Sequence, residues 1–504
     1  MIDTTIRSSK PPSIDGEYPF ELWSIIAGCV LALVAGLVFQ TQLACVLFMV
    51  LAISVGFVWR KGEVPILSYC LLVQWLFMAT GYLVWVRTGR FPGITPSRGL
   101  ETAIFLSILG LAAMTAGIRA GRMVFAKTLR RWVSTLPTEG PRYDVRKVMW
   151  LAVGAYSLDW IFRVERAALH FPGGQVVVSL LQFKVVVLFL LFLVIVRQRE
   201  GLRYGVFAAV VAWVPALASY MSSFSEVFQL VMLALLTAWQ PWRTDAGSRR
   251  TNRLVTSSLG VVGVVLVGMA LFWQGAVKRP WRTHLDEQGG DVRPLERVGQ
   301  LFTLARDVAG DFDIGEAAYD LGGRVSSGSA YFGSVVTNVP SVIPHEDGEL
   351  TKRALLHVTR PRFFFPEKEN LGGDSWLVQT YAREDVADER SGTSVGLGYF
   401  AQFYIDFAVP GMFAAVFVIG LLIAFIYEGL AIPAPTFEWW QATATALLLA
   451  SFTGYESEIA KMVGALVMTT AIFTVLLIAA RYGDKYLRWS PKKRMRMVAF
   501  AESP

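Results

Sequence analysis

The chain has 504 residues, of which 54% are hydrophobic and 17% are charged, and its mean hydropathy is +0.47. About a quarter of the residues of soluble domains are charged, so this composition excludes an ordinary soluble protein. The formal net charge is +8, but the basic residues gather between apolar runs, which indicates contact with anionic lipid rather than with nucleic acid.

The apolar residues form twelve runs, and a helix needs roughly 20 apolar residues to cross a bilayer. The runs lie near residues 22–39, 43–59, 64–86, 101–118, 148–168, 174–196, 204–221, 224–240, 254–273, 405–427, 437–453 and 462–480. In lipid, backbone polar groups must be hydrogen-bonded within the protein, and a helix does this within one segment. We therefore expect an all-α polytopic membrane protein with about twelve transmembrane helices.

The distribution of Lys and Arg predicts the orientation, because cytoplasmic loops are enriched in both residues. If the N-terminus is cytoplasmic, the basic segments 60–61, 119–147, 197–203, 243–253 and 481–496 all lie inside. The C-terminus is then cytoplasmic as well. The first residues are polar and partly acidic, unlike the basic start of a cleaved signal peptide, so we expect the first run to be an uncleaved anchor.

This topology predicts five parts. They are a cytoplasmic N-terminal segment (1–21), transmembrane helices 1–9 (22–273), an extracytoplasmic loop domain (274–404), transmembrane helices 10–12 (405–480) and a basic cytoplasmic tail (481–504). Long loops that have neither a fold nor a function are uncommon. We expect the large loop between helices 9 and 10 to form a small extramembrane domain or a re-entrant cap.

One stretch of this loop combines positive charge with aromatic residues. Five cations, Lys352, Arg353, Arg360, Arg362 and Lys368, accompany a single acid, Glu367, and Phe363, Phe364 and Phe365 lie among them. Arginine grips phosphate through two parallel hydrogen bonds, and lysine adds a point charge. The stretch is suited to a lipid-linked phosphate or pyrophosphate at the outer surface. Alternatively, the phenylalanines enter the headgroup region while the arginines contact ordinary lipid phosphates.

Ionisable residues also occur within or beside other apolar runs. Arg163 lies four residues after Asp159 near the end of the fifth run, Lys184 lies in the sixth, and Glu226 lies at the turn between the seventh and eighth. Such residues at membrane depth are costly and are usually functional or paired. An intrahelical ion pair between Asp159 and Arg163 is one reading, and an anion cavity at the outer interface is the other.

All four histidines, His170, His284, His345 and His357, fall outside on this topology. Histidine is the side chain best suited to proton transfer near neutral pH. The spacing of these residues matches no common zinc signature, so we predict no metal.

Three elements follow one another between residues 322 and 411: GGRVSSGSAYFGSVVTNVPSVIPHEDGEL, PRFFFPEK and TSVGLGYFAQFYIDFAVPG. Their order and their position resemble the Wzy-type membrane polymerases of oligosaccharide repeat units, which assemble O-antigens and exopolysaccharides in bacteria. The family pattern falls on Arg324, Pro361, Arg362, Pro366, Lys368, Thr393, Ser394, Tyr404, Asp406, Phe407 and Gly411. The chain departs from the pattern in two places, where Ala-Val-Pro-Gly follows Phe407 and Glu369-Asn370 follows the lysine.

The resemblance implies a reaction at the periplasmic face of the bacterial inner membrane. A growing glycan would pass from undecaprenyl pyrophosphate to the end of another lipid-linked oligosaccharide repeat unit. A flippase and a chain-length regulator of the same pathway would be partners. The resemblance implies no nucleotide sugar, no metal and no other cofactor, since the lipid pyrophosphate is already an activated leaving group.

The implied chemistry needs cations for the leaving pyrophosphate and a base for the attacking sugar hydroxyl. The candidate pyrophosphate-binding residues are Arg324, Arg360, Arg362, Lys368 and Arg163. The candidate bases are His345 and His357, followed by Asp406. Phe363, Phe364 and Phe365 are expected to contact lipid where the polyprenyl chain leaves the bilayer.

Three other functions compete with this one. An O-antigen ligase would share the donor and the architecture but deliver the glycan to another acceptor. A transporter would favour inverted repeats and small outer loops, and neither is evident in the sequence. A purely structural membrane anchor would leave the cations on the outer side without a role.

Overall fold

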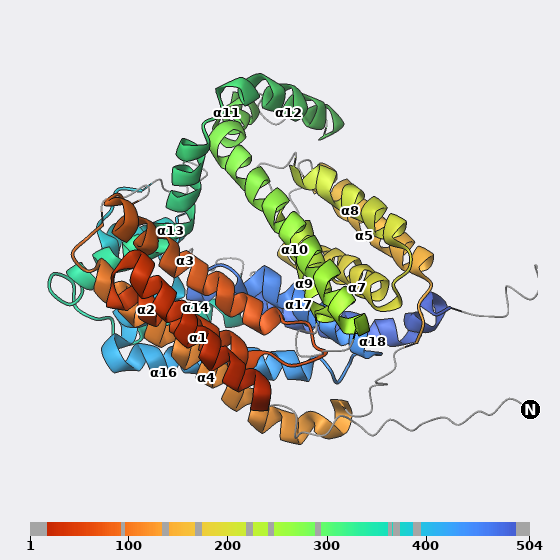
Figure 1. Cartoon of the computed structure of the whole chain (residues 1–504), viewed down its shortest axis with the longest axis horizontal. Helices are drawn as coiled ribbons and strands as arrows, with labels where there is room; N and C mark the ends of the chain where they lie inside the picture. The colour runs from red at the N-terminus through yellow and green to blue at the C-terminus, as the bar shows by residue number, and fades with distance from the viewer. Residues whose placement is uncertain are drawn as a thin grey trace, which may run out of the picture.

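A computed structural model describes residues 18–91, 96–133, 141–166, 174–217, 225–239, 246–287, 294–360, 365, 373–386 and 395–489. In these residues the regular structure is helical, and the only β-type pairing is an isolated bridge between Tyr143 and Arg488. The expected all-α fold class is therefore confirmed (Figure 1).

The helices are numbered in chain order. In the first half they are α1 (Tyr18–Phe39), α2 (Gln42–Val58), α3 (Ile66–Thr88), α4 (Leu100–Val133), α5 (Val145–Arg166), α6 (Gly174–Leu181), α7 (Phe183–Gln198), α8 (Leu202–Leu217), α9 (Ser225–Ala238) and α10 (Ala246–Phe272). In the second half they are η2 (Trp273–Val277), α11 (Lys278–Glu287), α12 (Pro294–Val308), η3 (Ala309–Asp311), α13 (Ile314–Asn338), α14 (Glu349–Thr359), α15 (Gly373–Leu377), η4 (Val378–Ala382), α16 (Tyr399–Gly429), α17 (Phe437–Phe452) and α18 (Ile459–Leu487).

Each of the twelve apolar runs coincides with helical structure. Six helical segments of the described chain are long and apolar enough to cross a membrane: Ile66–Thr88, Leu100–Phe125, Ser179–Gln198, Arg249–Leu285, Tyr399–Gly429 and Ile459–Leu487. Four shorter apolar helical segments, Ser24–Phe39, Gln42–Val58, Leu202–Trp213 and Ser225–Ala238, account for four of the remaining runs. The run near 174–196 is divided between α6 and α7 at Gln182.

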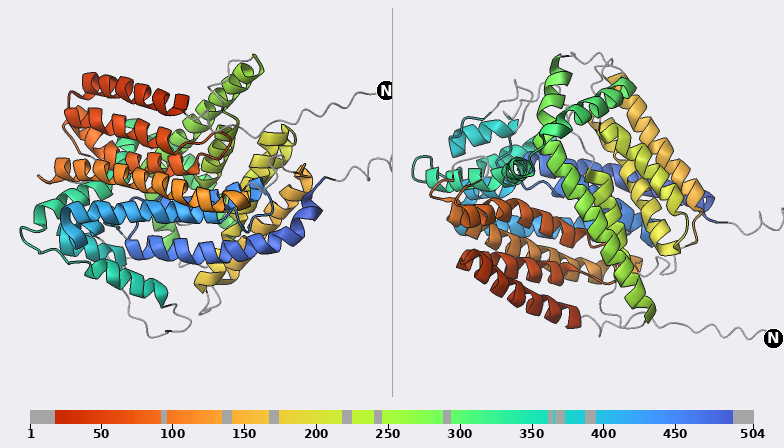
Figure 2. Two further views of the ribbon diagram at one scale, coloured as in Figure 1. Left: turned by 90° about the horizontal axis from the view of Figure 1, so that it is seen from below. Right: turned by 45° about the horizontal axis from the view of Figure 1, so that its top comes forward.

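Two groups of helices make up most of the molecule. Helices α1, α2, α3, α4, α16 and α18 run side by side in the left view of Figure 2, while α5 and α8 are inclined to them. Helix α7 lies in the interior, and every side chain from Val185 to Ile195 is buried. A helix that is apolar on all sides belongs in a core, which explains why its sequence lacks a polar face.

Helices α4 and α16 approach each other through glycines. A Cβ at Gly117 would lie 2.2 Å from the Phe417 carbonyl oxygen, and a Cβ at Gly420 would lie 2.4 Å from that of Met114. Only glycine permits this distance between backbones, as at the crossing points of membrane helices. The chain therefore joins the first and last thirds of its sequence at this contact.

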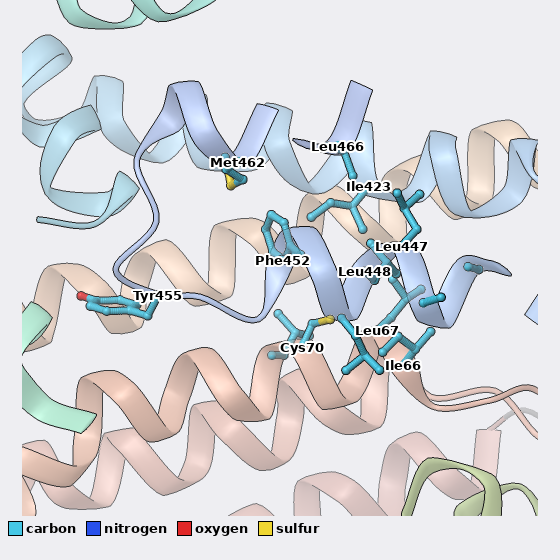
Figure 3. Packing of buried hydrophobic residues seen from close by; sticks show 14 of the residues in the cluster. Ile66, Leu67, Cys70, Ile423, Leu447, Leu448, Phe452, Tyr455, Met462 and Leu466 are labelled. Carbon is cyan, nitrogen blue, oxygen red and sulfur yellow. The ribbon is translucent and has the colours of Figure 1, made fainter. Parts of the chain in front are cut away.

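The core beside this crossing is built from α3, α16, α17 and α18. Figure 3 shows Leu67 and Cys70 of α3 facing Leu448 and Phe452 of α17, with Met462 of α18 on the other side of Phe452. Gln74 lies fully buried in this apolar region, but its side chain donates to the Phe452 carbonyl (3.0 Å). Buried polar groups without a partner are costly, so this bond matters for the packing.

Several segments that the sequence predicts to be cytoplasmic contact one another in the structure. The Arg122 guanidinium donates to Glu63 (2.6 Å) and to Glu428 (2.8 Å). Nearby, the Tyr143 hydroxyl donates to the Asp484 carboxylate (2.7 Å). The bonds of Arg122 join α4 to the loop after α2 and to the end of α16, and the Tyr143 bond joins the segment before α5 to the end of α18.

The segment between α10 and α16 packs against the bundle through α13. A Cβ at Gly81 of α3 would lie 2.4 Å from the Ser326 Cβ, and one at Gly99 would lie 2.3 Å from the Gly333 carbonyl oxygen. Helix α13 therefore lies directly on the ends of α3 and α4. Helices α10, α11 and α12 form a second, smaller apolar cluster around Trp281, and α11 and α12 lie at the top of Figure 1.

Candidate functional site

A polar stripe runs along α13. Asp320, Arg324, Ser327, Tyr331 and Ser334 are spaced by four, three, four and three residues, which places them on one face of a helix. The stripe faces the short segment 453–458 between α17 and α18, because a Cβ at Gly328 would lie 3.1 Å from atoms of Tyr455 and Glu456.

Arg324 and Glu456 form an ion pair at this stripe. Arg324 Nη1 lies 2.7 Å from Glu456 Oε2, and the Ser327 hydroxyl donates to Glu456 Oε1 (2.5 Å). The side chain of Arg324 is 55% exposed, whereas that of Glu456 is 14% exposed. The carboxylate is thus held by two donors from consecutive turns of α13, while the guanidinium still has an open side.

More cations from α11 lie close to Arg324. Lys278 is near enough to Arg282, Arg324 and Asp320 for charge–charge interactions. Arg279 lies 3.7 Å from the Asp320 carboxylate. One end of the α13 stripe is therefore rich in positive charge, with contributions from two helices that are separate in sequence.

A second carboxylate lies further along the same stripe. The Ser334 hydroxyl donates to Glu384 (3.0 Å), and Tyr331 is near enough to Glu384 and Glu456 to feel the charge of both. Burial, followed by the two carboxylates, raises the pKa of Tyr331 to about 12, although Arg324 opposes the shift. The phenol therefore stays protonated at neutral pH.

His345 lies at a turn before α14, packed on the start of α16. Its Nδ1 is 3.1 Å from the Ile405 carbonyl oxygen, and its ring contacts the Tyr404 ring edge-on at 5.4 Å. A carbonyl oxygen can only accept, so Nδ1 carries the proton in the neutral ring. Nε2 is then the basic nitrogen, as a general base at this position would require.

Asp406, the third candidate base, caps α14. Its carboxylate accepts from the amides of Leu350 (3.0 Å) and Thr351 (2.7 Å) and from the Thr351 hydroxyl (2.5 Å). The residue is 1% exposed. Because its oxygens satisfy the first amides of a helix, Asp406 orders the turn that carries His345.

His357 is not beside His345. His345 precedes α14, whereas His357 lies inside this helix, which has eleven residues and is therefore roughly 16 Å long. His357 lies in the last turn, where the Arg360 amide is 3.4 Å from its carbonyl oxygen. Arg360 itself is exposed. The structure thus places the predicted bases at both ends of one helix.

The polar stripe and the His345 turn are connected through η4. The Asn338 side chain, at the end of α13, donates to the carbonyls of Tyr381 (3.1 Å) and Ala382 (3.0 Å). The Tyr381 hydroxyl donates in turn to Glu346 (2.8 Å), the neighbour of His345. These bonds place η4 between the α13 stripe and the His345 turn. Turns of π-helix often occur at functional sites.

Several predicted site residues lie outside the described residues. These are Arg362, Lys368, Phe363 and Phe364, together with Pro361, Pro366, Thr393 and Ser394 of the family pattern. The backbone of Arg163 lies in the last turn of α5, but its side chain is also outside the description. Phe365 is described and is 49% exposed.

The ionisable residues inside the apolar helices are paired across helices. Lys184 Nζ lies 2.5 Å from the Asp159 carboxylate, and both residues are buried. Glu226 accepts from the Tyr156 hydroxyl (3.1 Å). Asp159 thus has a partner on α7. These contacts favour neither the intrahelical pair between Asp159 and Arg163 nor the anion cavity at the outer interface.

Sequence reasoning missed Glu456. The residue lies in GYESE, between two apolar runs, where a short loop that is predicted to lie outside carries two acids. Acids in such a loop were a usable signal, but the partner, Arg324, is 132 residues away. In the part of the chain that the structure describes, no group of three or more His, Cys, Asp or Glu side chains is arranged to hold a metal ion.

Comparisons of the chain with protein-family models, with curated proteins and with solved structures find no match.

Proposed function

We propose that the chain is a membrane glycosyltransferase that polymerises lipid-linked oligosaccharide repeat units. It would transfer a growing glycan from undecaprenyl pyrophosphate to the end of another lipid-linked unit at the outer face of the bacterial inner membrane. The observation that carries the proposal is the Arg324–Glu456 pair on the α13 stripe, with Lys278 and Arg279 nearby. Cations and a carboxylate are thus combined where α11, α13 and the segment 453–458 meet, and all three are predicted to lie outside.

The chemistry explains why both kinds of group are needed. Breaking the bond between the anomeric carbon and pyrophosphate develops negative charge on the leaving group, and preorganised cations stabilise that charge. The attacking hydroxyl must lose a proton, which a carboxylate or a neutral imidazole accepts. The α13 stripe supports the first requirement through Arg324, and either Glu456 or His345 supports the second.

The predicted grip of Arg362 and Lys368 on the pyrophosphate remains part of the proposal. Both residues follow α14, whose last turn ends beside the exposed Arg360. The phenylalanines between them supply an apolar surface for the polyprenyl chain. An arginine beside such a surface suits a ligand with a charged head and a lipid tail.

Replacement of Arg362 by alanine tests the proposal in cells. Long polymer should be lost while single-repeat glycolipid accumulates, because the donor is made but not elongated. Arg306→Ala, which changes an exposed arginine of α12, is the matched control and should leave the polymer unchanged. Normal chain lengths in Arg362→Ala, at normal protein levels, would contradict the proposed role of this residue.

The glycolipids of a deletion strain test the reaction itself. A polymerase deletion should leave lipid-linked single repeats. Long polymer that stays attached to the lipid would identify a ligase instead. Purified protein that elongates lipid-linked repeats without any other component would establish the activity directly.

A further inference from the structure

We infer that Glu456 is the residue that accepts the proton of the attacking sugar hydroxyl, and that Arg324 passes from Glu456 to the leaving diphosphate. This inference rests on the proposed function and assigns its general base to a residue that the family pattern does not include. It replaces His345, His357 and Asp406 in that role.

The first argument is the position of the carboxylate. A general base and the cations that stabilise the leaving group must reach the same pair of reacting sugars. Glu456 lies 2.7 Å from Arg324, and Arg324 is close to Lys278. The side chain of Arg324 is 55% exposed, so its guanidinium can also reach a bound substrate.

The second argument is how Glu456 is held. Its segment is short and closely packed: the Ser457 amide donates to the Gly454 carbonyl (3.2 Å), and a Cβ at Gly396 would lie 2.1 Å from the Glu456 carbonyl oxygen. The carboxylate is shielded from bulk water but not sealed, since 14% of the side chain is exposed. Shielding strengthens electrostatic interactions in the site, and the exposed part admits a substrate.

The third argument is the nature of its partners. Both donors to Glu456 are side chains, Arg324 and Ser327, and side chains can rotate away. Asp406, in contrast, also accepts from two backbone amides, which are fixed in the first turn of α14. A diphosphate competes well with a carboxylate for arginine because it carries more negative charge.

The reaction then proceeds in one balanced step. Arg324 binds the donor diphosphate, which frees Oε2 of Glu456. The acceptor hydroxyl gives its proton to that oxygen, and its own oxygen bonds to the anomeric carbon of the donor glycan. The bond from that carbon to the diphosphate breaks, and the electron pair leaves on the diphosphate, beside Arg324. Glu456 then returns the proton to water.

The test uses full-length protein in lipid nanodiscs with a synthetic undecaprenyl-pyrophosphate-linked repeat unit. Glu456→Gln keeps the size of the side chain and its contact with Ser327 but removes the proton acceptor. Its turnover should fall about 100-fold or more, with little change in KM for the lipid substrate. Arg324→Ala should raise KM and lower kcat together, because the arginine contacts the donor.

Glu349→Gln is the matched control. Glu349 belongs to a comparable ion pair, 2.8 Å from Lys352, but lies exposed on α14, and its loss should leave turnover unchanged. Normal turnover of Glu456→Gln beside an active wild type would refute the inference while leaving the proposed function intact. An inactive wild type would instead refute the proposed function, and the inference with it.

The dependence of turnover on pH separates a base from a structural residue. If Glu456→Gln is inactive and also has a lower melting temperature, Glu456→Asp decides between a role as proton acceptor and a role in the fold. If residue 456 accepts the proton, the shorter and more acidic aspartate should shift the acidic limb of the plot of kcat against pH relative to the wild type. A lower rate with an unmoved limb would mean that Glu456 only supports the fold, and the inference would be rejected.

Discussion

Replacing Arg122 by methionine is expected to destabilise the fold by about 3 kcal/mol, the lower end of the range for breaking a buried ion pair. The Arg122 side chain is 5% exposed and bonds to Glu63 and Glu428, which are 16% and 3% exposed. Methionine retains the apolar part of the arginine side chain but leaves the shielded carboxylates of Glu63 and Glu428 without the Arg122 guanidinium. The lower end applies because Arg60, 3.6 Å from Glu428, still balances part of the charge.

The matched control is Arg142→Met. Arg142 lies 2.7 Å from Glu200, a distance like those of Arg122, but the two side chains are 53% and 59% exposed. Water and salt screen such a pair, which is worth less than about 1 kcal/mol. Unfolding of the purified variants in one detergent, followed by tryptophan fluorescence, measures both changes. Equal destabilisation by the two substitutions would refute the reasoning from burial.

The same network predicts a dependence of stability on pH. Burial alone would raise the pKa of Glu63, but Arg122 and Arg60 outweigh it and hold that pKa below 4.5. A carboxyl with a lowered pKa stabilises the fold above its ordinary pKa, and this contribution is lost as the pH falls through the folded-state value. The advantage of the wild type over Arg122→Met should therefore shrink below about pH 4.5.

Three further substitutions test other parts of the fold. Gly117→Leu should prevent α4 from packing on α16 and abolish folded protein in size-exclusion chromatography, whereas Gly260→Leu, with nothing within 4 Å of its Cβ, should be tolerated. Ala408→Gly should raise the melting temperature through a gain of about 1 kcal/mol, since φ 54° and ψ −162° suit glycine; a lower melting temperature would refute this. Asp406→Ala should cost about 1–2 kcal/mol through the lost cap and speed hydrogen exchange at the Leu350 and Thr351 amides, and unchanged exchange would contradict the capping role.

The helices were the most predictable part of the fold. Apolar runs of membrane-spanning length depend on composition alone, and each coincides with helical structure. Their ends were less predictable: α4 continues to Val133, well past the apolar run near 101–118. Arg122 lies in that extension, and its two carboxylate partners come from other segments. A hydropathy pattern contains no information about such partners.

The site was predictable only where residues are close in sequence. His345 was predicted as a candidate base and an apolar run was predicted near 405–427, but the contact between His345 and Ile405 joins residues 60 apart. Asp406 was predicted as a reacting group, whereas the structure gives its oxygens to the amides of α14. Glu456 was overlooked because its significance comes from Arg324, which only the packing of α13 brings near.

The small apolar cluster around Trp281 has a mechanical consequence. Lys278 and Arg279 belong to that cluster's helix, whereas Arg324 belongs to α13, and the two parts touch where Gly275 meets Ala317. A Cβ at Gly275 would lie 2.4 Å from the Ala317 Cβ, so any larger residue at position 275 would push these two parts away from each other. In the proposed polymerase, the distance of Lys278 and Arg279 from Arg324 would therefore depend on how closely η2 packs against α13.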